Sequence, residues 1–172
     1  QISRPLDLLK HRGIEVIQAD ITKIDPIARV VVVGDRTLAG DHVIISLGAD
    51  LAPEIVPGLR EEAHLFYEPG GASRLWEALS NFSGGRVLIL IAATPFKCPA
   101  APYEAAMLLE DYFRKRGLRG KVDLSVYTPE PLPMPVAGPA VGNAVKWMVE
   151  AKGIGFHPQM KVASVDSSTK EL

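Results

Sequence analysis

The sequence contains a single cysteine, Cys98, among its 172 residues. A lone cysteine excludes a disulfide within the chain and a zinc site built from several cysteines. Neither sign of charge is in excess, because 19 Lys and Arg residues stand against 20 Asp and Glu residues and the formal net charge is -1. Without a basic surface to neutralise a phosphate backbone, we expect no nucleic-acid binding.

Long apolar runs are also missing. The longest, residues 30–33 and 87–93, fall far short of the roughly 20 residues that a transmembrane helix needs. A peripheral membrane contact through other regions stays compatible with the sequence, as does a prokaryotic cytoplasmic or periplasmic location. The four histidines are scattered without acidic partners at ligand or triad spacing, so we expect no metal site and no catalytic histidine.

Both ends of the sequence interrupt an expected element. Gln1 lies inside a helix-like pattern, Leu172 follows a strand-like run, and no initiator Met or targeting segment is visible. We therefore expect these residues to be an internal part of a longer protein.

The first 50 residues predict a small β-rich segment. A helix should end at Gly13, and three strands should follow over residues 14–19, 29–33 and 41–47, with a turn at Gly34-Asp35. Proline and glycine then accumulate over residues 50–71, which predicts a connector and a domain boundary near residue 50.

After the connector, strands and helices alternate. Helices are predicted over residues 73–82, 103–116 and 143–152, and strands over residues 86–91, 121–127 and 161–165. Trp76 and Trp147 are expected to pack, whereas Glu110 and Asp111 are expected on solvated faces. This order predicts an α/β fold with a parallel sheet flanked by helices.

Ligands of such sheets bind in the loops after the carboxyl ends of the strands. The loop after residues 86–91 contains Cys98 and three prolines but no glycine. A dinucleotide-binding turn needs glycines so that the pyrophosphate can approach the helix N-terminus. The composition of this loop therefore argues against a nicotinamide site of the usual form.

Two interpretations of Cys98 remain open from the residues alone. Lys97 and the N-terminus of the helix that begins near Pro102 favour a thiolate, and the flanking prolines, including Pro99, would hold the sulfur in place. A lone cysteine is also commonly a small buried apolar residue. Likewise, Gly48 in the Ser46-Leu47-Gly48-Ala49 segment permits either close approach of a ligand or a sharp exit turn.

Two segments resemble the flavin-dependent pyridine nucleotide-disulfide oxidoreductase superfamily, in particular its sulfide:quinone oxidoreductase and flavocytochrome c sulfide dehydrogenase branch. Ser46-Leu47-Gly48-Ala49 is similar to the A-T-G-like motif at the end of the FAD domain, with Ser46 in place of the commoner alanine. The loop and helix start from Phe96 to Glu104 resemble the proline-flanked cysteine loop of the branch.

The resemblance implies a Rossmann-like fold in two parts. Residues 1–50 would be the C-terminal part of an FAD-binding domain, and residues 51–172 a second, NAD-domain-like domain that is truncated at its end. Gly48 and Ala49 would lie near FAD. Cys98 would be the catalytic redox cysteine, one half of a disulfide or polysulfide bridge, with Lys97 and Pro99 supporting its loop.

By this resemblance, the longer protein oxidises sulfide or a persulfide and passes electrons through FAD to quinone or a cytochrome. The FAD fingerprint and a second cysteine are absent from these residues, so we expect this chain alone neither to hold FAD nor to be active. Two alternatives stay open: an ordinary FAD-dependent NAD(P)H reductase, and a non-catalytic docking domain whose proline-rich loop, residues 128–142, binds a partner subunit.

Overall fold

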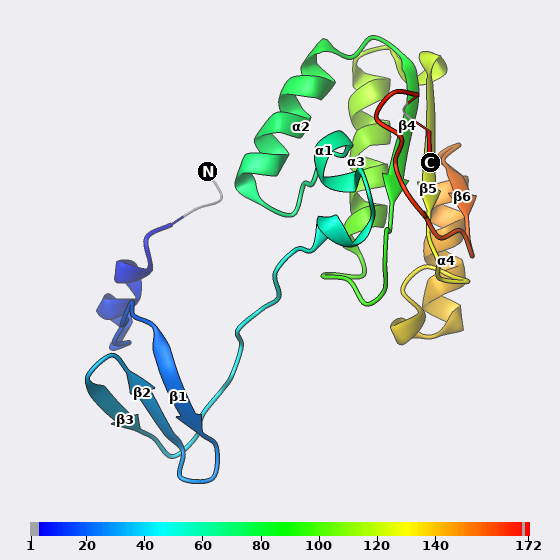
Figure 1. Ribbon diagram of the computed structural model, residues 1–172. Helices are drawn as coiled ribbons and strands as arrows, with labels where there is room; N and C mark the ends of the chain where they lie inside the picture. Colours follow the sequence, from blue (N-terminus) through cyan, green and yellow to red (C-terminus); the bar gives the residue numbers. More distant parts are fainter. Residues whose placement is uncertain (1–3, 170) are drawn as a thin grey trace. The chain divides into compact units, whose positions relative to one another are not determined.

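The computed structural model describes residues 4–169 and 171–172 and divides the chain into two compact units, Gln1–Gly48 and Ala49–Leu172 (Figure 1). The first unit contains a short 3-10 helix, η1 (Leu6–Arg12), which ends at Gly13 in the left-handed conformation as expected. Three antiparallel strands follow in the order β1-β2-β3: β1 (Ile21–Asp25), β2 (Val30–Val33) and β3 (Arg36–Ala39).

The hairpin of the first unit turns where the sequence predicts. Val33 pairs with Arg36, so that Gly34 and Asp35 form a two-residue turn, and Gly34 takes a φ of 59° that favours glycine. The strands predicted over residues 14–19 and 41–47 are wrong, since neither segment forms a strand. A β-branched run becomes a strand only where a neighbouring edge offers hydrogen bonds. Within the described residues, neither segment pairs with the outer edge of β1 or β3.

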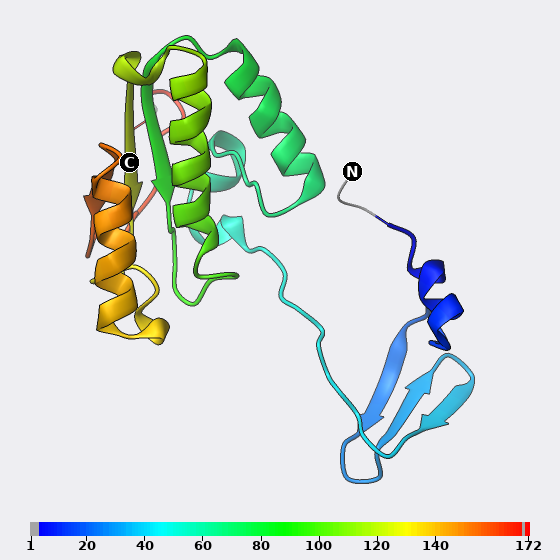
Figure 2. The same cartoon turned by 180° about the vertical axis from the view of Figure 1, so that it is seen from behind.

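The second unit is built on three parallel strands in the order β4-β5-β6: β4 (Gly85–Leu90), β5 (Val122–Tyr127) and β6 (Gly155–His157). The helices α3 (Ala101–Lys115) and α4 (Pro139–Glu150) connect them and cover one face of the sheet (Figures 1 and 2). The expected α/β class, a parallel sheet with helices beside a β-rich segment, is confirmed.

The connector contains more structure than expected. It includes η2 (Pro53–Ile55) and α1 (Leu59–Glu62), and α2 (Pro69–Asn81) begins four residues before the predicted helix because Pro69 suits the first turn. The strand predicted over residues 161–165 is also wrong. That segment crosses the sheet face opposite α3 and α4 (Figures 1 and 2), and one backbone bond, from the Val165 N–H to the Pro57 carbonyl at 2.8 Å, joins it to the connector.

The core lies between the sheet and its helices. Val126, Ala106, Phe113 and Val149 are fully buried, and Tyr103 is 1% exposed. Full burial of a Val or Phe side chain stabilises the folded state by about 1.5–3 kcal/mol. Trp76 and Trp147 were expected to pack. Trp76 is 60% exposed with its ring edge-on to Tyr112, at 5.6 Å between centroids, whereas Trp147 is 70% exposed.

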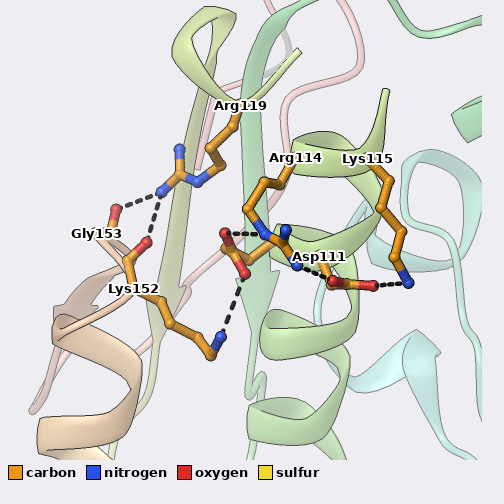
Figure 3. A network of polar contacts seen from close by, with 7 residues as sticks. Asp111, Arg114, Lys115, Arg119, Lys152 and Gly153 are labelled. Carbon is orange, nitrogen blue, oxygen red and sulfur yellow. Dashed lines mark hydrogen bonds and ion pairs between the residues drawn. The ribbon is translucent and has the colours of Figure 1, made fainter. Parts of the chain in front are cut away.

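Glu110 corrects a second expectation from the sequence. It is 6% exposed, and its carboxylate lies 3.6 Å from Arg114 Nε and 3.4 Å from Lys152 Nζ. The pair with Lys152 joins α3 to the end of α4 (Figure 3). Asp111, one position along, is more exposed and pairs with Arg114 and Lys115; the hydrogen bond from Lys115 lowers the pKa of Asp111. Glu110 is therefore buried because it faces the end of α4, whereas the adjacent Asp111 remains more exposed.

Arg119 fixes the end of α4 from the side of the sheet. It lies in η3 (Arg119–Lys121), and its guanidinium donates to the carbonyl of Val122 at 2.8 Å. It also donates to the carbonyls of Gly153 at 2.6 Å and Lys152 at 3.3 Å (Figure 3). The carbonyls of Lys152 and Gly153 lie in the turn that follows α4. Arg119 therefore joins the start of β5 to the end of α4.

Candidate functional site

The loop between β4 and α3 places Cys98 at the carboxyl edge of the parallel sheet. β4 ends at Leu90, α3 begins at Ala101, and the N–H of Ala101 donates to the Cys98 carbonyl at 3.0 Å. The helix therefore begins close to Pro102, as the sequence predicts, and its first turn takes the carbonyl of Cys98. Cys98 is exposed, which removes the interpretation as a buried packing residue.

The backbone of Cys98 adopts an unusual conformation. Its φ of 51° lies in the left-handed region, which costs a residue with a Cβ about 1–2 kcal/mol. The proline that follows, Pro99, further restricts the backbone of its predecessor. Such conformations persist where surrounding contacts determine them, and they concentrate at functional sites.

Tyr67 holds this loop from a different part of the unit. Its hydroxyl donates to the Lys97 carbonyl at 2.9 Å, across 30 residues of sequence. Burial raises the pKa of Tyr67, and the nearby charge of Cys98 raises that pKa further. The phenol therefore stays protonated and remains a donor. Sequence reasoning missed Tyr67, because the contact is not local and the connector carries no periodic pattern.

Lys97 and Pro99, predicted to support the loop, flank Cys98 directly. The Lys97 side chain is exposed and lines a groove of about 790 Å³ within the second unit, and Pro99 is half-buried. The groove is predominantly apolar, and its lining also includes Ala49 and Phe66, with Leu88 and Leu90 of β4. The structure thus places Ala49 and Lys97 on one groove.

Gly48 closes the first unit with a φ of 76°, and a Cβ built on it would meet no atom within 4 Å. A backbone of this kind needs glycine and leaves open space beside it. Gly13, Gly34 and Gly117 share both properties, so the role of Gly48 beside FAD stays a prediction. We assign no other described residue to FAD, apart from the predicted neighbour Ala49.

A second polar cluster lies where β5 ends. Tyr103 Oη and one carboxylate oxygen of Glu130 are buried, and no described residue forms a hydrogen bond with either. Burial and then the charge of Glu130 raise the pKa of Tyr103 to about 12, while Thr128 beside it lowers that pKa. Burial likewise raises the pKa of Glu130. No signal in the sequence marked these three residues as a group.

The proline-rich loop, residues 128–142, packs on the unit to which it belongs. Thr128 and Pro133 are fully buried, and the carbonyls of Thr128 and Glu130 accept bonds from Met160 and Gln159 at 2.9 and 3.2 Å. Its short helix η4 (Pro135–Ala137) leaves Val136 86% exposed. Part of this loop is therefore a structural connection.

The remaining sequence expectations concern metals and membranes. Within the described ranges, no group of three or more His, Cys, Asp or Glu side chains is arranged to hold a metal ion. Over the same residues, no helix has the length and apolar character required to cross a bilayer. His157 stacks on Tyr127, with ring centroids 4.3 Å apart.

Comparison with known proteins identifies a class. A family model described as the central part of the flavoprotein chain of sulfide dehydrogenase (flavocytochrome c) matches residues 74–128, the segment that contains Cys98. The chain is thus similar to proteins of the sulfide:quinone oxidoreductase and flavocytochrome c sulfide dehydrogenase branch of flavin-dependent oxidoreductases, in agreement with the resemblance drawn from its sequence.

Particular relatives are sulfide:quinone oxidoreductases. The mitochondrial enzyme of Mus musculus is 31% identical over 122 residues, which cover 65% of this chain and 26% of the relative. The mitochondrial enzyme of Dictyostelium discoideum is 23% identical over 167 residues, 93% of this chain and 36% of the relative. The chain thus spans about a quarter to a third of the length of these relatives.

A solved structure matches the fold. The sulfide:quinone oxidoreductase of the hyperthermophilic bacterium Aquifex aeolicus superposes with a TM-score of 0.68 at 24% identity, over 94% of this chain and 39% of that structure's chain. The α/β architecture described above is therefore shared with this enzyme.

Proposed function

We propose that the longer protein to which this chain belongs is a flavin-dependent oxidoreductase that oxidises sulfide or a persulfide, with Cys98 as its redox cysteine. The observation that carries the proposal is the exposed, left-handed Cys98 at the carboxyl edge of the parallel sheet, inside the segment that matches the sulfide dehydrogenase flavoprotein. The glycine-free loop supports it further, because it lacks the turn that a nicotinamide pyrophosphate requires.

The chemistry asked of Cys98 is a two-electron step. Its thiolate sulfur forms an S–S bond with the sulfur of HS⁻, which leaves a persulfide on Cys98. The bond formation oxidises the Cys98 sulfur and the sulfide sulfur by one electron each and releases one proton and one electron pair. FAD supplies the acceptor for that pair, together with the proton, when it is bound. Quinone or a cytochrome then takes the electrons onward.

The residues near Cys98 have roles in this proposal. Lys97 supplies positive charge beside the thiolate, and Pro99 limits the motion of the loop. Gly48 and Ala49 would approach FAD with open backbone. With Cys98 the sole thiol of the chain, a disulfide or polysulfide bridge would use a second cysteine outside these 172 residues.

The test follows the flavin absorbance of the complete protein under anaerobic conditions while sulfide, or separately NADH, is added. We expect sulfide to bleach the flavin and NADH to leave it oxidised. Cys98→Ser should abolish bleaching by sulfide, because a hydroxyl cannot form the S–S bond. Thr94→Ser, a conservative change in the same loop, should bleach at the wild-type rate.

The other outcomes are equally informative. Bleaching by NADH alone would overturn the proposal in favour of an NAD(P)H reductase, and bleaching by neither would favour a docking domain. Unchanged sulfide bleaching in Cys98→Ser would remove Cys98 from the reaction.

A further inference from the structure

We propose that Tyr67 is the positioning residue of the Cys98 loop, holding the redox cysteine through the backbone rather than through its sulfur. The proposal rests on the proposed function of Cys98. Tyr67 lies between α1 and α2, yet its hydroxyl reaches across to the Lys97 carbonyl at 2.9 Å. That carbonyl belongs to the peptide unit that leads into Cys98, so the phenol fixes the backbone immediately before the reactive residue.

The loop requires such an anchor. Cys98 combines a left-handed backbone with a proline as its next residue, and both features disfavour the conformation observed. Two hydrogen bonds hold the flanking carbonyls. Tyr67 donates to the Lys97 carbonyl, and the Ala101 N–H at the start of α3 donates to the Cys98 carbonyl at 3.0 Å. Removing the Tyr67 bond leaves the amino side of Cys98 free to relax.

The surroundings of Tyr67 suit a rigid anchor. Its ring stacks on Phe66, with centroids 5.3 Å apart and an interplanar angle of 21°. Tyr67 also lines the apolar groove together with Phe66 and Lys97.

The experiment compares Tyr67→Phe with Tyr112→Phe in the complete flavoprotein. Tyr112 is the matched control because its hydroxyl also donates to a backbone carbonyl, that of Leu79, at 3.2 Å. Both changes remove one oxygen and keep the ring. Stopped-flow absorbance measures flavin reduction over a range of sulfide concentrations, and hydrogen–deuterium exchange with mass spectrometry measures the amides of residues 96–103. Flavin content and thermal midpoint are recorded for the same preparations.

Tyr67→Phe should lower the limiting rate of flavin reduction at least tenfold, since small displacements of a reacting group have large effects on rate. The sulfide concentration at half-maximal rate should stay within twofold, because the change alters geometry and not sulfide binding. Exchange over residues 96–103 should accelerate at least fivefold. Tyr112→Phe should stay within twofold of wild type in rate, half-saturation and exchange.

The outcomes separate this inference from the proposed function. If Cys98→Ser blocks the reaction while Tyr67→Phe matches wild type in rate and exchange, the inference is overturned and the proposed function stands. An equal loss of rate in Tyr67→Phe and Tyr112→Phe would show general destabilisation and also overturn it. If Cys98→Ser reacts normally, the proposed function fails, and a positioning role for Tyr67 in that reaction fails with it, even where exchange still shows the anchor.

Discussion

Two oxygens buried near the end of β5, Tyr103 Oη and Glu130 Oε2, lie without hydrogen-bond partners among the described residues. Glu130 is half-buried, but its buried oxygen has no partner, which is costly in the charged form, and burial accordingly raises the pKa of Glu130 above its ordinary value. The folded state therefore holds the proton of Glu130 more tightly than the unfolded state does. By linkage, ionisation of Glu130 lowers the free energy of unfolding as pH rises from the pKa of the unfolded chain through the higher pKa of the folded state.

Glu130→Gln tests this at the level of one residue. The variant should have a higher urea midpoint than wild type at pH 7–8, because it avoids burying a charge. The advantage should shrink toward pH 4, where wild-type Glu130 is protonated. The measurement is urea unfolding at several pH values, with the exposed Glu77→Gln as control. A stabilisation that is constant with pH, or that Glu77→Gln shares, would contradict a cost from burial.

Elements join through a few side chains, and Arg119 is one of them. Its planar guanidinium reaches the carbonyls of Val122, Lys152 and Gly153 together. A lysine carries the same charge but cannot present several donors in that fixed plane. Losing hydrogen bonds from a charged donor typically costs about 1.5–3 kcal/mol.

Arg119→Lys should therefore lower the free energy of unfolding by about 2 kcal/mol. Arg74→Lys on α2 changes an exposed arginine in the same way and should stay within about 0.5 kcal/mol of wild type. Urea unfolding monitored by circular dichroism measures both. Equal effects of the two substitutions would mean that the contacts of Arg119 at the end of α4 contribute little.

The elements also show how far the sequence predicts this fold. β4, β5 and α3 were predictable because each carries a local signature: a buried apolar run for the strands and a 3.6-residue period for the helix. The predictions of strands over residues 14–19, 41–47 and 161–165 were wrong, because strand pairing depends on a neighbouring strand edge that the local sequence does not encode. β6, only three residues long, carried no signal of its own.

The candidate site divides in the same way. The position of Cys98 after β4 follows from the alternation of strands and helices, and the left-handed Gly48 follows from the local sequence. Tyr67 and Glu110 were missed or misplaced because their partners, Lys97 and Lys152, lie 30 and 42 residues away. Contacts between residues so far apart in sequence arise from tertiary packing, which a local sequence pattern does not predict. The catalytic role of Cys98 and the cofactor role of Gly48 remain predictions.

At the scale of the whole molecule, the two units are joined through a segment without regular structure. Residues 43–50 form no helix or strand, and Ile44, Ile45 and Leu47 are 91%, 54% and 75% exposed. Proteases cut backbone that is exposed and free of regular hydrogen bonding. Residues 49–172, in contrast, enclose the buried core.

Limited digestion with thermolysin, which cleaves before large apolar residues, should first cut between residues 43 and 47. Mass spectrometry should then detect a stable product that begins there and continues into the second unit. Leu88 and Leu108, which are exposed on regular elements of that unit, serve as internal control sites and should be cut much later. Early cleavage at either would contradict the prediction that residues 43–47 are the segment most accessible to the protease.

Because Cys98 is exposed and is the single cysteine of these 172 residues, it determines which disulfide can form on oxidation. With one thiol per molecule, a disulfide formed in air must join two molecules, and it consumes both reactive groups at once. The oxidised product is therefore a covalent dimer of twice the 18.6 kDa chain, and reductant returns the monomer. The single thiol also allows one thiol-reactive label per chain, attached at Cys98 in the loop of the candidate site.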